Sequence, residues 1–149
     1  GPERVLGEQN VGAGFLQIDF NRHKTAHIIR AVQEGIAFAL NYGLEVMHEV
    51  GLNIDMIRAG SSNMYQSTVF RQTLANTSGL PIELFDTDGA LGAAIGAGIG
   101  AEIFQDRKEA FKGLKKISDI ELENELHEEY QDAYENWKLE LTKNLNNRG

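Results

Sequence analysis

The stretch RAGSSNM, residues 58 to 64, is the segment of this 149-residue chain that is best suited to chemistry. It lies where a short apolar run typical of a buried strand gives way to a predicted helix. Such a junction exposes free main-chain N–H groups beside the positive end of a helix, so it can bind an anion or a nucleotide. An ordinary capped turn without a ligand is the alternative, and the residues alone favour that alternative.

A second unusual stretch is TDGALGAAIGAGIGAEIF, residues 87 to 104. It contains no GxxxxGK[ST] phosphate loop, and its GAGIG comes late in a predicted helix rather than between a strand and a helix. Its charge-free run of 13 residues is shorter than the ~20 that span a bilayer. Because Gly92, Gly96 and Gly100 share one helix face, the spacing predicts that another backbone packs closely there.

Two further pairs of side chains could in principle bind a metal ion. His23 and His27 are four residues apart on one helix face, but no third ligand accompanies them at a recognisable spacing. Asp86 and Asp88 could orient a metal or a ribose, yet acidic residues before a helix usually cap it. We assign no metal ligand and no catalytic residue within the chain.

Composition excludes several classes of function. The chain has no cysteine, so it has neither disulfides nor a thiolate metal site, which suits a cytoplasmic protein. Its formal net charge of -8 repels phosphate backbones and anionic lipids, and this disfavours nucleic acid or a membrane surface as the main partner.

The elements that would position these residues alternate between helix and strand. The pattern predicts a possible strand at 14–20, a helix at 23–50 stopped by Gly51, a strand at 52–59, a helix from Ser67 or Thr68 to 77, a strand at 80–85, and a helix at 89–104. This order favours parallel strands joined by crossover helices in a layered, helix-rich α/β domain.

A shift in charge separates residues 1–104 from residues 105–149. Residues 105–118 are basic and polar, whereas residues 119–146 are strongly acidic. Apolar side chains recur in this tail every three or four residues, so one face of a helix can dock on an apolar surface. The tail residues that we expect to dock include Tyr130, Tyr134 and Trp137.

Four motifs in the same order resemble the C-terminal lobe of the FGGY family of carbohydrate kinases, most closely its xylulokinase branch. RAVQEGIAFAL at 30–40 is similar to the family's helix RAVLEGIAFAL, and DGALGAAIGAG at 88–98 to its ALGAA helix. The family's adenosine loop, and the helix and strand after it, are similar to residues 57–84, IRAGSSNMYQSTVFRQTLANTSGLPIEL. GPERVL at the start is similar to the end of its GERTP turn.

The resemblance implies a partial ribonuclease-H-like, actin-like ATPase lobe, with parallel strands between helices and a C-terminal helical tail. It implies that ATP binds at the turn, which by position selects Gly60, Ser61, Ser62, Asn63, Met64 and Ser67. Magnesium is implied as well, with its ligands mostly outside this chain. The implied reaction transfers the ATP γ-phosphate to a sugar hydroxyl. D-xylulose is the sugar that the resemblance favours, and its product would be xylulose 5-phosphate.

The resemblance also implies that the catalytic aspartate, the sugar pocket and an N-terminal kinase lobe lie outside this chain, which would then be inactive alone. Another sugar or polyol is one alternative. A non-catalytic assembly module that binds no nucleotide is another, and self-association through exposed strand edges is also expected.

Overall fold

The structure is a computed structural model, and it describes residue 6 and residues 12–146 of the chain. Most of the motif at residues 1–6 therefore lies outside the described residues. In order along the chain, the elements are α1 (Thr25–Glu49), β1 (Ile57–Gly60), η2 (Asn63–Gln66), α2 (Thr68–Ser78), β2 (Ile82–Phe85), α3 (Gly89–Gly100), α4 (Arg107–Phe111), β3 (Lys116–Ile120), η3 (Asn124–Leu126) and α5 (His127–Asn146).

The three strands form one mixed sheet in the order β1-β2-β3. β1 and β2 are parallel, with Ile57 opposite Ile82, and α2 is the crossover helix between them. β3 runs antiparallel to β2 and places Ile120 opposite Ile82. The helix-rich α/β fold and the parallel pairing are thus confirmed, but β3 was not predicted. The sheet is therefore mixed rather than wholly parallel.

The core lies between one face of the sheet and the helices α1 and α2. Its buried residues are Ala37, Phe70, Leu74, Ala75, Ile82, Leu84 and Ile120. The opposite face of the sheet is polar, since Arg58 and Lys116 both pair with Glu83 across the strands. One face of the sheet is therefore covered by α1 and α2, and the other carries charge.

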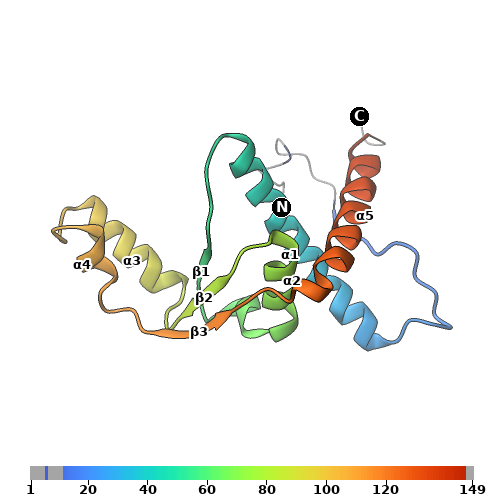
Figure 1. Cartoon of the computed structure of the whole chain (residues 1–149), viewed down its shortest axis with the longest axis horizontal. Helices are drawn as coiled ribbons and strands as arrows, with labels where there is room; N and C mark the ends of the chain where they lie inside the picture. The colour runs from blue at the N-terminus through green and yellow to red at the C-terminus, as the bar shows by residue number, and fades with distance from the viewer. Residues whose placement is uncertain (1–5, 7–11, 147–149) are drawn as a thin grey trace.

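The C-terminal helix α5 docks on α1 (Figure 1). The Tyr134 side chain is fully buried, its ring lies 5.7 Å from that of Phe38, and Trp137 lies 6.2 Å from Phe38. The Lys138 ammonium pairs with Glu45 of α1 at 3.2 Å. The predicted docking of the tail through Tyr134 and Trp137 is confirmed. The division of the chain at residue 104 stays a prediction, although β3 ties the later segment to the sheet.

The starts and stops of several helices agree with the sequence analysis. Ser67 caps α2 by accepting from the Phe70 N–H, and Asp88 caps α3 by accepting from the Leu91 N–H. Gly51, at φ +88°, follows α1 in the left-handed conformation that glycine tolerates best.

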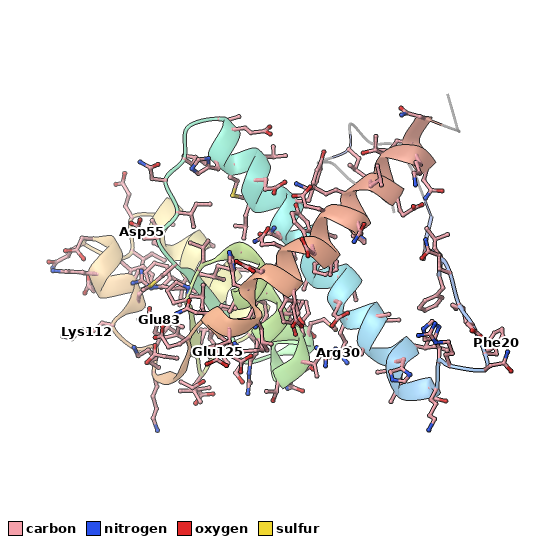
Figure 2. The ribbon with its side chains drawn as sticks, turned by 45° about the vertical axis from the view of Figure 1, so that its right-hand side comes forward. Phe20, Arg30, Asp55, Glu83, Lys112 and Glu125 are labelled. Carbon is pink, nitrogen blue, oxygen red and sulfur yellow. The ribbon has the colours of Figure 1, made fainter. Side chains whose placement is uncertain are left out.

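Three predicted element bounds were wrong. Residues 14–20 form no strand, and their Phe15, Leu16 and Phe20 side chains are exposed. Figure 2 shows Phe20 at the outer edge of the molecule, and none of the strands in the described part of the chain pairs with this segment. The strand predicted at 52–59 is confined to residues 57–60, the only part of it that lies beside β2. The third bound concerns α3, which was expected to reach residue 104.

α3 ends at Gly100 because the chain turns back at Glu102, where φ is +56°. The turn brings the Phe104 ring against Gly98, so close that a Cβ on Gly98 would lie 2.5 Å from it. Gly92, Gly96 and Gly100 have no such neighbour within 4 Å, and all three are exposed. The prediction that another backbone packs on this face is therefore wrong for the described chain, where the close contact occurs at Gly98.

Candidate nucleotide site

A cavity of about 1470 Å³ opens beside the carboxyl ends of the two parallel strands. The segments that follow β1 and β2 both line it, as do the first turn of α3, the α4 region, and Ile36 and Leu40 of α1. In Figure 1, α3 and α4 lie at one end of the molecule, beyond the sheet from α1 and α5. Ligands of open α/β sheets bind outside the carboxyl ends of parallel strands, so the cavity occupies the expected place.

Four of the six residues predicted to bind the nucleotide line this cavity: Gly60, Ser62, Asn63 and Met64. Ser61 and Ser67 are not among its lining residues. The segment between β1 and α2 is also longer than a simple turn, because the 3-10 helix η2 intervenes. The predicted turn and the cavity therefore coincide, while a contact between any of these residues and a ligand stays a prediction.

The main-chain donors of the turn are unequally available. The Ser61 N–H donates to the Phe85 carbonyl at 2.9 Å, and the Ser62 N–H donates to the Gly60 carbonyl at 2.8 Å. The N–H groups of Asn63 and Met64 donate to no acceptor among the described residues. Asn63 is exposed and has a left-handed φ of +50°, a conformation that asparagine adopts more readily than most residues. The donors free to meet a ligand are thus those of Asn63 and Met64.

Gly60 permits the two post-strand segments to approach each other. A Cβ at this position would lie 2.4 Å from the Thr87 carbonyl oxygen, which is a main-chain atom. Any larger residue would push apart the segments that follow β1 and β2. The glycine therefore lets the main chains at Gly60 and Thr87 lie in contact where both line the cavity.

Ser67, which does not line the cavity, is engaged in hydrogen bonds with three other segments. Its hydroxyl donates to the Gln33 side-chain oxygen of α1 and accepts from the Phe70 N–H at 3.4 Å. Its N–H donates to the Met64 carbonyl at 3.0 Å. These bonds join η2, α2 and α1 at one residue.

Of the charged residues that line the cavity, the sequence analysis considered only Asp88. Arg58 and Glu83 come from the polar face of the sheet, and Lys108 and Lys112 come from the α4 region. The Arg58 guanidinium, and after it the Lys116 ammonium, lower the pKa of the Glu83 carboxyl. Figure 2 shows Glu83 and Lys112 at the same end of the molecule. The basic composition of residues 105–118 was the signal that could have pointed to the two lysines.

Tyr65 was also missed, although it lines the cavity beside Met64. Its ring packs edge-on to the Phe70 ring at 5.3 Å, and burial raises the pKa of its hydroxyl. Tyr65 therefore joins the wall of the cavity to the hydrophobic core.

Within residues 6 and 12–146, no group of three or more histidine or acidic side chains could hold a metal ion. The Asp88 carboxylate is instead the cap of α3, at 2.9 Å from the Leu91 N–H. His23 and His27 each accept a main-chain N–H bond near the start of α1. In the same part of the chain, no helix is both long and apolar enough to cross a bilayer.

Comparison with known proteins agrees with the fold. Residues 7–101 match the FGGY family of carbohydrate kinases, C-terminal domain. The L-xylulose/3-keto-L-gulonate kinase of Escherichia coli is 29% identical over 78% of this chain and 24% of its own length. The xylulose kinase of Haemophilus influenzae is 28% identical over 94% of this chain and 29% of its own length. The crystal structure of xylulose kinase from Rhodospirillum rubrum aligns with a TM-score of 0.72 at 20% identity, over 87% of this chain and 27% of that one.

The fold is that of an actin-like ATPase lobe, and the family region that matches is a C-terminal domain. The chain belongs to the FGGY family of carbohydrate kinases. It spans about a quarter of the length of the relatives that it matches.

Proposed function

We propose that the protein carrying this chain is an ATP-dependent sugar kinase, and that the chain supplies the part of it that binds ATP. The nucleotide would lie in the cavity beside the carboxyl ends of β1 and β2, against Gly60, Ser62, Asn63 and Met64. Ser61 and Ser67 would support this wall from behind. A cytoplasmic location, where ATP is available, belongs to the same proposal.

The observation that carries the proposal is the pair of free main-chain donors at the cavity. The N–H groups of Asn63 and Met64, with no acceptor among the residues described, can donate to an anionic or polar ligand. Successive N–H groups in a turn form an anion-binding concavity. The volume of about 1470 Å³ is above the roughly 300–1,000 Å³ of ordinary ligand pockets, so the cavity has room for a ligand as large as a nucleotide.

In phosphoryl transfer the protein contributes mainly positioning and charge stabilisation. This lobe would hold ATP in place, while a base elsewhere in the protein deprotonates the sugar hydroxyl that attacks the γ-phosphate. Magnesium would supply charge neutralisation on the phosphates. The described residues contain no group of three or more histidine or acidic side chains that could hold the ion. The magnesium ligands would therefore come mostly from outside this chain.

For the sugar we propose D-xylulose, which would become xylulose 5-phosphate. Support comes from the xylulose kinases among both the sequence relatives and the structural neighbours. Comparing the rates of ATP-dependent phosphorylation of D-xylulose, L-xylulose and gluconate by the intact natural protein tests this choice. A clear preference for either of the other two would overturn it.

The nucleotide site is tested by titrating ATP into the intact protein and two variants at position 63. Asn63→Val places a β-branched residue at a left-handed φ, which is strained by roughly 1–2 kcal/mol, so the turn should shift and the dissociation constant should rise about tenfold. Asn63→Gly keeps the backbone conformation and the N–H, so it should bind ATP nearly as the parent does. Equal affinity of all three proteins, or no ATP binding by the parent, would contradict the proposal.

A further inference from the structure

A side-chain hydrogen bond joins α1 to Ser67, the residue that follows η2 and caps α2. The Gln33 Oε1 atom accepts from the Ser67 hydroxyl, while the Gln33 Nε2 atom donates to the Ile29 carbonyl at 3.5 Å. The second bond turns the amide so that its oxygen faces Ser67. Gln33 is half-buried, and one turn further along α1, Ala37 packs in the core with Phe70 of α2.

Ser67 transmits this contact to the turn. Its N–H donates to the Met64 carbonyl at 3.0 Å, its carbonyl accepts from the Arg71 N–H at 3.2 Å, and its hydroxyl caps α2. The Arg71 guanidinium also donates to the Tyr65 carbonyl at 3.3 Å. The carbonyls of Met64 and Tyr65 are thus both held by donors at the start of α2, whereas the N–H groups of Asn63 and Met64 donate to no acceptor among the described residues.

We propose that Gln33 is a positioning residue for the nucleotide: through Ser67 it fixes η2 so that the free N–H groups of the turn face the cavity. This inference rests on the proposed function, and it assigns to Ser67 a role through the turn rather than by contact with ATP. A preorganised donor costs no reordering when the ligand arrives, so loosening it weakens binding.

The test uses the intact natural protein with three variants. Gln33→Leu removes the acceptor at similar volume, whereas Gln33→Glu keeps an oxygen that can accept from Ser67. Gln72→Leu is the matched control. The Gln72 side-chain amide also holds α2, but it donates to the Glu121 carbonyl at 2.9 Å and not to the turn. Two quantities are measured: deuterium exchange of the amides of residues 61–66 without nucleotide, and the dissociation constant of ATP.

We expect Gln33→Leu to speed exchange in residues 61–66 and to raise the ATP dissociation constant about three- to tenfold, the usual contribution of one hydrogen bond. Gln33→Glu should restore both values, and Gln72→Leu should lower the melting temperature without changing either. Unchanged exchange in Gln33→Leu, faster exchange with unchanged affinity, or an equal effect of Gln72→Leu would overturn the inference. Failure of the parent to bind ATP would refute the proposed function instead, and the exchange data would still decide whether Gln33 holds the turn.

Discussion

At Gly60 the main chain of β1 passes so close to Thr87 that no side chain fits between them. The contact joins the two segments that follow the parallel strands. It therefore determines how far apart these segments lie where they line the cavity. A glycine in this place is required by a close approach of backbone to backbone rather than by an unusual φ.

We predict that Gly60→Ala destabilises the chain by about 1–3 kcal/mol, the usual effect of forcing an extra methyl group into a packed site. Gly96→Ala is the matched control, because a Cβ there meets nothing within 4 Å and alanine favours a helix interior by up to about 1 kcal/mol. Urea unfolding measures both changes. A stability of Gly60→Ala equal to that of the parent would show that Thr87 moves aside freely.

Two elements that are far apart in sequence, α1 and α5, hold each other through an aromatic cluster. Phe38 of α1 lies against Tyr134 and Trp137 of α5, and Tyr134 is the largest fully buried side chain among the described residues. Burial raises the pKa of the Tyr134 hydroxyl, since the phenolate would be poorly solvated there. This cluster supports α1, and α1 in turn carries Gln33 behind the nucleotide turn.

We expect Tyr134→Ala to lower the free energy of unfolding by about 3–5 kcal/mol, as for other large aromatic residues truncated in a core. Leu139→Ala, on the same helix but 53% exposed, should change it by less than about 0.5 kcal/mol. Thermal or urea unfolding followed by circular dichroism gives both values. Similar effects of the two substitutions would mean that α5 does not dock through its aromatic face.

At the scale of the whole molecule, the open faces of α3 are the main unexplained feature. The helix is apolar throughout its length, yet Leu91 is 44% exposed and only Ile95 and Gly98 are buried. The chain spans about a quarter of the length of its relatives. A full kinase of this family therefore contains much structure that is outside this chain, including, on our proposal, the lobe that holds the sugar.

We predict that the 149-residue chain alone does not phosphorylate D-xylulose, because the proposed base and sugar pocket are not among its residues. ADP production in a coupled assay, with the intact natural protein as the positive control, measures this. Sugar-dependent turnover by the chain alone would show that it contains a catalytic base that we have not assigned.

The sequence by itself determined the elements whose signals are local. Periodicity, capping chemistry and alternation along the chain predicted the long first helix, though at 23–50 rather than 25–49. They also predicted the Ser67 and Asp88 caps, the parallel pair of strands and the place of the turn at 60–64. Only the tertiary structure decided what depends on distant partners. Residues 116–120 became a strand because β2 offered an open edge, whereas residues 14–20, with no such partner, did not.

The same division holds for the candidate site. The turn could be found in the sequence, but which of its N–H groups remain free depends on carbonyls brought from Phe85 and from within the turn itself. The Ser67 hydroxyl donates to Gln33, which is 34 residues away along the chain. Hydrogen-bond partners are chosen by proximity in space, and a single sequence does not encode that proximity in any local pattern.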